Sequence, residues 1–315
     1  MELLTYTDPN RKDAGYLEGF SLDLENGKED DFEIKLPLDS FHNLSAGCLI
    51  YCENHPQYGG RVEKFNPNTA ANTVTFIGST WRGVFKKKIL LNNINVTPSK
   101  TLEEITSEII SAANLTELFE PASNGSAIGL SMLAGRYMTP LATLETILSA
   151  VGCRPSFRYS ATSRRILIGT EAIKDYSKSE YDSSQINMEL SVNKMPTNHV
   201  IGIDKSGHVH HLYLMHDGSY SQTQEITGAA EVTKLIEISS DDSAVILQKL
   251  TETMDAEQKK ATSSALSVAE ISAEIGDIVG ANEQHSKTFV VSKVTSKVLK
   301  MTDKTFQINF ETGEF

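Results

Sequence analysis

The sequence predicts a β-rich α+β fold, and two observations lead to that class. Short alternating segments separated by turn residues fill residues 1–96 and return from residue 186 onwards, which is typical of strands in small barrels or sandwiches. Helical periodicity interrupts these segments within residues 97–153 and again at about 241–260. The predicted order is therefore β, α, β, α, β, without an exact internal repeat.

The first β region, residues 1–96, is predicted from alternation and turn chemistry. Residues 17–24 alternate and are followed by Asn26-Gly27, the dipeptide that favours a two-residue hairpin turn. The next strand alternates through Phe32, Ile34 and Leu36, and Pro37 ends it. Further strands are expected at 47–53, 61–65 and 73–77.

Helix signals dominate residues 97–153. Thr101 followed by Glu104 predicts a capping box, in which each side chain binds the backbone N–H of the other residue. A second helix is expected to begin at Thr139-Pro140 and to stop before Gly152, because proline suits the first helical position and glycine the C-terminal end. The apolar stripes of both helices are interpreted as core packing.

The second half of the chain is predicted to return to strands. A hairpin is expected within residues 154–175, and β pattern covers 186–238 and 265–310. A third helix is expected over about 241–260, with Ser240 as its N-cap and Lys259 and Lys260 at its C-terminal end.

Composition and charge restrict the class of protein. The 315 residues include 41 acidic and 29 basic side chains, so the formal charge is −12. This balance argues against stable nucleic-acid binding, which needs clustered Lys and Arg. Neither a secretion signal nor an apolar run long enough to span a bilayer is recognised. The cysteines Cys48, Cys52 and Cys153 are expected to be reduced and packed, as in a cytoplasmic setting.

Five of the eight histidines fall within residues 198–227, which raises the possibility of a metal site. On a strand, His208 and His210 share one face, and with a carboxylate such as Asp217 they could bind zinc. The competing interpretation is a half-buried strand with ordinary polar histidines, because Leu212, Tyr213 and Leu214 continue the strand directly. The second interpretation is preferred, so no metal ligand is assigned.

The rest of the sequence contains no specific catalytic motif. There is no serine-nucleophile elbow and no phosphate-binding loop. Paired carboxylates such as Glu103-Glu104 and Asp241-Asp242 lie at predicted helix starts, where they complement the helix dipole. We therefore expect a protein that is not an enzyme, with no catalytic residue and no cofactor.

Three stretches of sequence, which in order cover about two thirds of the chain, carry a family resemblance. They are Gly59-Gly60-Arg61-Val62-Glu63 through Gly78-Ser79-Thr80-Trp81-Arg82-Gly83; Asn198-His199-Val200-Ile201 with His211-Leu212-Tyr213, Asp217-Gly218 and Ser221-Gln222-Thr223-Gln224; and Ile275-Gly276-Asp277-Ile278-Val279-Gly280. Together they resemble the baseplate hub proteins of phage tails. The sequence departs from that pattern at Ala281, where the family has a second glycine, and at the shortened loop 204–207.

The resemblance implies a structural protein of a phage or a phage-tail-like particle such as a bacteriocin. Hubs of this family form homotrimers, and each chain contributes two tail-tube-like β-barrel domains with helical or α+β insertions. The trimeric ring joins the hexameric tail tube to a central spike or tip and lets the tail contents pass. The implied partners are the tail tube, spike or tip, tape measure and other baseplate proteins, without membrane insertion.

The same resemblance gives the expected domains and location. The first barrel is assigned to residues 1–96, the insertion domain to 97–178, and the second barrel to 179–315 with an inserted helix near 241–260. The implied location is the tail baseplate of the virion or particle, assembled in the bacterial host cytoplasm. The shortness of the chain favours a contractile tail.

Other classes of function were weighed against the hub. Larger hub relatives carry a peptidoglycan-degrading domain, but the last predicted strands end just before Phe315 and leave no room for one. A metal-dependent enzyme would use the histidine-rich strand, with His208 and His210 as ligands. A receptor- or carbohydrate-binding module would need clustered exposed aromatic residues, whereas the aromatics are scattered along the sequence.

Overall fold

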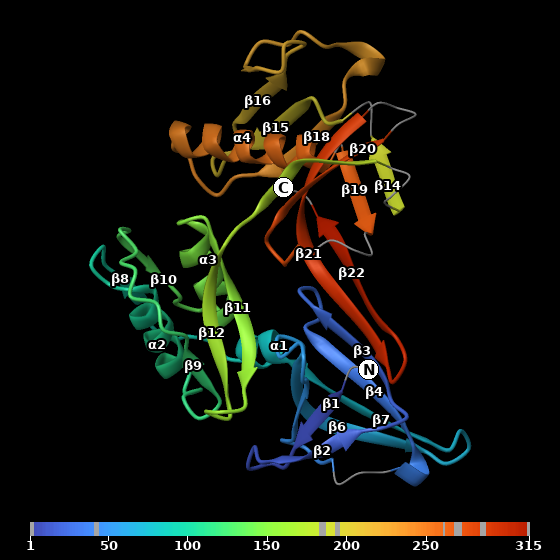
Figure 1. The fold of residues 1–315 in the computed structure, drawn as a ribbon. Helices are drawn as coiled ribbons and strands as arrows, with labels where there is room; N and C mark the ends of the chain where they lie inside the picture. Colours follow the sequence, from blue (N-terminus) through green and yellow to red (C-terminus); the bar gives the residue numbers. More distant parts are fainter. Residues whose placement is uncertain are drawn as a thin grey trace. The chain divides into compact units, whose positions relative to one another are not determined.

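The computed structural model describes residues 3–40, 44–182, 187–192, 196–260, 262–267, 273–283 and 288–313. Strands predominate over helices along the chain, as Figure 1 shows, and the expected β-rich α+β class is confirmed. The chain divides into two compact units. Unit 1 comprises Met1–Tyr181, Ser267–Gly280 and Lys293–Glu311, and unit 2 comprises Asp182–Leu266, Ala281–Ser292 and Thr312–Phe315.

A large, mainly antiparallel sheet forms the base of unit 1. Within the described residues its strand order is β13-β20-β21-β3-β4-β7-β6-β5-β1-β2, and β22 pairs with β21. The bounds are β1 Leu4–Thr7, β2 Asp13–Leu17, β3 Ser21–Asn26, β4 Asp31–Pro37, β5 Leu49–Cys52, β6 Gly59–Asn68, β7 Thr73–Thr80, β13 Asp175–Asp182, β20 Ile278–Glu283, β21 Thr288–Thr302 and β22 Phe306–Gly313. A short 3-10 helix, Leu38–Ser40, follows β4.

Strands far apart in sequence meet in this sheet. Lys297 to Thr302 of β21 pair with Asn26 to Ser21 of β3 in antiparallel register. One sheet thus combines strands from both predicted barrels. The domain boundaries near residues 96 and 178 stay a prediction.

Two details of the predicted first region are wrong. The alternating segment 17–24 is two strands, since β2 ends at Leu17 and β3 begins at Ser21. Asn26-Gly27 does not form a two-residue turn, because β4 begins only at Asp31. The Asp30 carboxylate closes the longer loop by accepting a hydrogen bond of 2.7 Å from the Gly27 N–H.

The core beneath the sheet explains the cysteines. Cys48 and Cys52 are fully buried among the apolar side chains of β3, β4 and β7, so their predicted role as packed thiols is confirmed. Leu299 and Met301 of β21 enter the same core, and the Cys52 Sγ lies 3.5 Å from the Met301 Sδ.

The second part of unit 1 combines helices and short strands. Its elements are α1 Trp81–Lys86, β8 Ile94–Val96, α2 Leu102–Ala112, β9 Phe119–Pro121, β10 Met132–Ala134, α3 Pro140–Ser149, β11 Cys153–Ser160 and β12 Arg165–Ala172. β11 and β12 form the predicted hairpin, and β9 adds to β12 in parallel. Helix α1 was not predicted, because its six residues are too few to show a periodic pattern.

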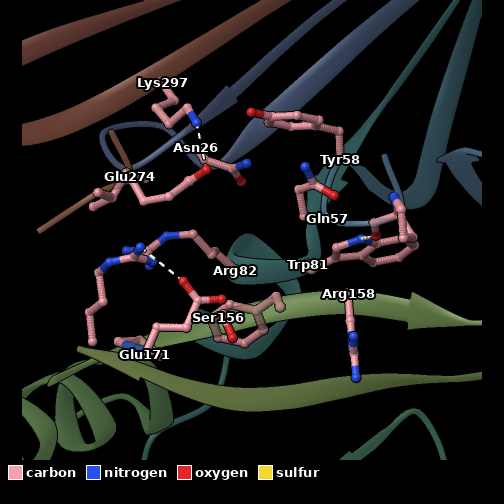
Figure 2. A pocket seen from close by; sticks show the side chains of 15 residues that line it. Asn26, Gln57, Tyr58, Trp81, Arg82, Ser156, Arg158, Glu171, Glu274 and Lys297 are labelled. Carbon is pink, nitrogen blue, oxygen red and sulfur yellow. Dashed lines mark hydrogen bonds and ion pairs between the residues drawn. The ribbon is translucent and has the colours of Figure 1, made fainter. Parts of the chain in front are cut away.

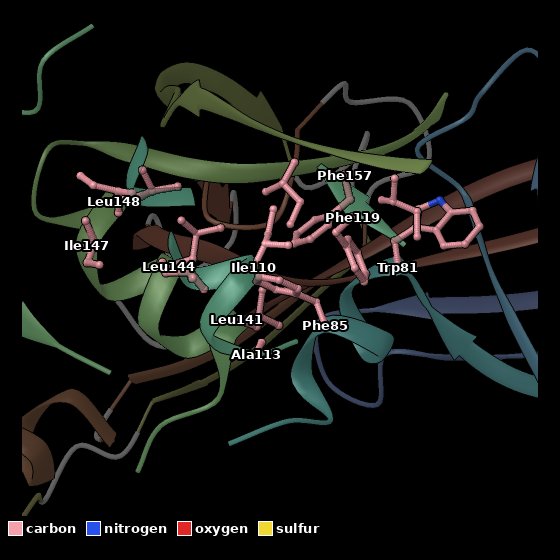
Figure 3. Close-up of a cluster of buried hydrophobic side chains, with 14 of the residues drawn as sticks. Trp81, Phe85, Ile110, Ala113, Phe119, Leu141, Leu144, Ile147, Leu148 and Phe157 are labelled. Atoms are coloured by element: carbon pink, nitrogen blue, oxygen red, sulfur yellow. The ribbon is translucent and has the colours of Figure 1, made fainter. Parts of the chain in front are cut away.

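The predicted capping residues of α2 and α3 are confirmed. The Glu104 N–H donates to the Thr101 hydroxyl at 3.1 Å, and the Thr101 N–H donates to the Glu104 carboxylate at 2.7 Å, which is the predicted capping box. Pro140 begins α3 after the capping residue Thr139. Figure 3 shows the core that the helices cover, where the rings of Phe85, Phe119 and Phe157 meet side chains such as Ile110 and Leu144.

Unit 2 is a small sheet covered by one helix. The sheet order is β17-β16-β15-β18, with bounds β15 His199–Ile203, β16 Val209–Leu214, β17 Tyr220–Ser221 and β18 Thr233–Glu237. Helix α4, Ser243–Lys260, packs Ile246, Leu250 and Met254 against Val200 and Leu212. The unit also holds a 3-10 helix, Gly228–Ala230, and the strand pair β14 Asn187–Val192 and β19 Thr262–Ser267.

The predicted start of this helix needs a correction. Asp242, not Ser240, caps α4: its Oδ1 accepts hydrogen bonds from the Ala244 and Val245 N–H groups at 2.8 and 3.2 Å. The Ser240 hydroxyl instead accepts from the Asp242 N–H. No helix in the described ranges is long and apolar enough to cross a membrane.

Candidate functional site

A polar cavity of about 360 Å³ lies within unit 1. Figure 2 shows Tyr58 and Gln57 on one side of it, Arg82 at the start of α1, and Glu274 and Lys297 opposite. Strand β11 contributes Arg154 through Arg158 to the wall. The cavity therefore lies where α1, β11 and two C-terminal segments of the unit meet.

Carboxylates neutralise the buried cations of this cavity. Arg82 binds Asp30 at 3.2 Å through Nε and Glu145 at 2.7 Å through Nη2. Arg154 lies 3.0 Å from Asp277 and 2.9 Å from Glu171. Lys297 contacts Glu274 at 2.8 Å. Each buried cation therefore has one or two carboxylate partners, and these ion pairs form a polar joint that connects the segments around the cavity.

Asp277 organises one end of the joint. Its fully buried carboxylate accepts hydrogen bonds from the Lys174 and Glu274 N–H groups, both at 2.9 Å, as well as from Arg154 Nε. Gly276 has a φ of +99°, a backbone conformation that favours glycine. The Ile275-Gly276-Asp277 stretch that carried part of the family resemblance thus has a structural explanation.

Two titratable side chains that line the cavity have shifted pKa values. Burial raises the pKa of the Tyr58 hydroxyl, although the nearby Lys297 ammonium opposes that shift. Burial acts to lower the pKa of Lys297, but Tyr58 and Glu274 outweigh it and raise that pKa, so the ammonium remains charged. None of the lining residues is His or Cys.

Gly59, in the first of the three stretches that carry the family resemblance, allows its strand to pack closely against Trp81. A Cβ on Gly59 would lie 2.4 Å from the Ile50 carbonyl oxygen and 2.4 Å from Trp81 Cζ2. Trp81 is fully buried and donates from Nε1 to the Pro56 carbonyl at 3.2 Å. The Gly59-to-Trp81 pattern is thus a packing requirement, in which the strand must approach the indole without a side chain.

The structure separates the three residues of the metal hypothesis. His208 Nδ1 and His210 Nε2 both contact the Asp204 carboxylate, at 3.2 and 2.9 Å, so the predicted shared side of these histidines is observed. Asp217 does not join them, because its carboxylate accepts from the Ser219 N–H and hydroxyl at 2.9 and 2.6 Å. Across the described residues, no three His, Cys, Asp or Glu side chains are arranged to hold a metal ion.

Asp204 was the residue that sequence reasoning missed. Hydrogen bonds from the His210 ring and from His208 lower the pKa of Asp204 to about 2. The carboxylate also accepts from the His208 N–H at 2.8 Å, which closes the turn between β15 and β16. The available signal was an aspartate four residues before His208, the spacing of a tight turn closed by a side chain.

The histidines of the family-like pattern form a second cluster. His199 Nδ1 lies 2.6 Å from the Glu231 carboxylate, and its Nε2 lies 2.9 Å from His211 Nδ1. The His199 ring stacks on Tyr213 at 4.1 Å between centroids. Asn198 donates to the Ala230 carbonyl and accepts from the Val232 N–H at 2.8 and 2.9 Å. These contacts fix β15 beside the chain that leads into β18.

Comparisons with known proteins place this fold. No family model matches the sequence, and no curated protein matches it either. Three solved structures match 99% of the chain: a tail protein from Neisseria meningitidis MC58 (12% identity, 96% of that chain, TM-score 0.52), the 43 kDa tail protein of prophage MuSo2 from Shewanella oneidensis (10%, 97%, 0.57) and the prophage tail protein gp18 from Listeria monocytogenes EGD-e (12%, 95%, 0.51). The chain has the fold of these phage tail proteins, and the expected resemblance is confirmed at that level.

Proposed function

We propose that this chain is a structural baseplate hub protein of a phage or phage-tail-like particle, and not an enzyme. The observation that carries the proposal is the fold likeness, which extends over 99% of this chain and over at least 95% of each of the three tail proteins. A shared module within otherwise different proteins would give a shorter match. The cavity also supports a structural role, because its buried cations form ion pairs with carboxylates of the same unit.

In this role three copies form a ring between the hexameric tail tube and the central spike or tip. Its further neighbours are the tape measure protein and other baseplate proteins, and its location is the baseplate of a contractile tail, after assembly in the host cytoplasm. Two barrel-like domains per chain, 1–96 and 179–315 with the insertion 97–178 between them, would give the ring six similar positions, which suits a hexameric tube.

The charge of the chain fits such a ring. A formal charge of −12 disfavours binding of DNA phosphates, so an acidic lumen would let DNA or the tape measure protein pass without holding it. A structure of the assembled ring tests this point through the residues that face the lumen. A strongly basic lumen would refute it.

Mass measurement of the assembled protein tests the proposal most directly. We expect the purified full chain to sediment as a trimer, or to form one on addition of purified tail tube or spike protein, since some rings close only on a partner. Co-expression with those two proteins should yield a co-purifying complex. A chain that remains monomeric and binds neither protein would contradict the hub assignment.

A further inference from the structure

Four large apolar side chains on and beside β8 and β10 of unit 1 are exposed, and together they are called the knob. Its members are the side chains of Leu91, Tyr137, Leu133 and Ile89, which are 71%, 67%, 66% and 55% exposed. Backbone hydrogen bonds of 2.9 and 2.8 Å join Leu90 to Met138 and Tyr137, and Leu133 pairs with Asn95 between the two strands. Apolar side chains gathered in this way are typical of a surface that another molecule covers.

Cations accompany the knob. The Arg136 guanidinium lies 4.9 Å from the centre of the Tyr137 ring and donates to its hydroxyl at 3.1 Å. Lys88 is also exposed, and neither cation has a carboxylate partner among the residues described. Tyr137 has a φ of +63° in a turn that the Met138 N–H closes by donating to the Gly135 carbonyl at 2.9 Å. Tyr and Arg together are the residues that most often dominate binding energies.

A hollow lined by acidic side chains lies on the outer face of β3, β4 and β7. It measures about 450 Å³, and its lining includes Phe32, Ile77 and Val298. Ile77 and Val298 are partly exposed, whereas the Phe32 side chain is buried in the core of the sheet. Four carboxylates surround these apolar groups: Asp23, Glu25, Asp31 and Glu33. The knob and the hollow both belong to unit 1.

The carboxylates of the hollow repel one another. Asp23 lies directly opposite Glu33 in the antiparallel register, and like charges in that position destabilise a sheet. Burial raises the pKa of Asp31, and Glu25, Glu29 and Asp23 raise it further. Lys35 contacts Glu33 at 2.9 Å and Lys300 contacts Asp23 at 3.6 Å. Glu25 accepts a hydrogen bond of 2.8 Å from the Ser296 hydroxyl, but within the described ranges neither Glu25 nor Asp31 forms an ion pair with a cation. A cationic partner would relieve this repulsion.

We infer that the knob of one copy binds the hollow of a second copy. Leu91, Leu133 and Tyr137 would cover the partly exposed Ile77 and Val298, while Arg136 and Lys88 would meet the carboxylates of Glu25 and Asp31. A second copy is the favoured occupant because this chain itself presents both complementary surfaces, whereas its charge of −12 otherwise keeps copies apart. The contact joins two different surfaces, and such a contact generates a ring when the rotation between successive copies closes. This inference rests on the proposed trimeric ring and identifies the contact between neighbouring copies in that ring.

Charge reversal of the full-length chain tests this contact. The knob variant is Arg136→Glu, the hollow variant is Glu25→Lys with Asp31→Lys, and the combined variant carries all three changes. Lys205→Glu, an exposed lysine in unit 2, is the matched control for charge. Fluorescence of Trp81 in each variant confirms that unit 1 is folded. Sedimentation equilibrium, alone and with purified tail tube protein, gives the association constants.

We expect the knob and hollow variants each to weaken self-association at least about tenfold, because like charges would then meet. The combined variant should recover most of the loss, and Lys205→Glu should have no effect. Wild-type association that both variants leave unchanged would refute the contact and leave the ring standing. If Arg136→Glu weakens self-association and the hollow variant does not, the knob binds a different surface, and the hollow is refuted as its partner. A wild-type chain that stays monomeric even with tube protein would refute the contact and the ring together.

Discussion

Removal of the Asp277 carboxylate should be among the most damaging single changes to unit 1. Asp277→Ala removes the fully buried carboxylate partner of Arg154, whose side chain is only 7% exposed and which then keeps Glu171 alone. Breaking a buried ion pair in this way costs about 3–5 kcal/mol. The Lys174 and Glu274 N–H groups also lose their acceptor, at about 1–3 kcal/mol each when they stay buried. Since water can enter and such losses are not additive, we expect a total of about 4–5 kcal/mol.

Urea unfolding followed by tryptophan fluorescence measures this loss specifically. Trp81 is the single tryptophan of the chain and is fully buried in unit 1, so its signal reports that unit. Asp277→Asn should cost about 2 kcal/mol. The amide oxygen still accepts from Arg154, but the amide N–H group then faces the backbone N–H of Glu274, and two donors cannot form a hydrogen bond. The double variant Arg154→Met with Asp277→Ala should be less destabilised than the sum of its single variants.

Asp8→Ala is the matched control, since Asp8 accepts one backbone hydrogen bond in an exposed turn of the same unit. It should cost at most about 1 kcal/mol. If Asp277→Ala unfolds at a urea concentration no lower than that of Asp8→Ala, the polar joint does not depend on the Asp277 carboxylate.

Three further changes test the packing, capping and charge arguments by the same unfolding measurement. Gly59→Ala should destabilise unit 1 by about 1–3 kcal/mol and alter Trp81 emission, because the new methyl group would overlap the indole; unchanged emission would contradict this. Thr101→Ala should cost about 1 kcal/mol through loss of the capping box, and Thr101→Ser should restore most of it. Asp31→Asn should stabilise the dissociated chain at neutral pH by a few tenths of a kcal/mol, because the raised pKa means that ionised Asp31 disfavours the folded state. That gain should vanish as the pH falls below the pKa of Asp31, and an equal gain at all pH values would argue against a charge effect.

Sequence reasoning worked where the determining contacts are local. The capping box at Thr101, the proline start of α3 and the alternation of Phe32, Ile34 and Leu36 depend on neighbours within a few residues, and the structure contains all of them. The thiol packing of Cys48 was predictable for the same reason.

Prediction from the sequence failed where a side chain that is distant along the chain determines the local geometry. The turn after Asn26 is lengthened because Asp30 binds Arg82 and Lys86, more than fifty residues away in the sequence. His208 and His210 turn to Asp204 and not to Asp217, because the β15–β16 register, which no motif specifies, brings Asp204 beside them. The polar cavity was not predicted at all, since its lining residues come from segments whose contacts appear only in the folded chain.

The pairing of β21 with β3 has a consequence for synthesis of the protein. The partner of β3 begins at Lys297, so the ribosome must add roughly 270 more residues after β3 emerges, which takes on the order of tens of seconds. Throughout that interval β3 has an unpaired edge, and Leu22 and Leu24 lack the cover of Leu299 and Met301. Exposed strand edges of this kind recruit other chains. We therefore expect the nascent N-terminal half to depend on chaperones until the last long strand arrives.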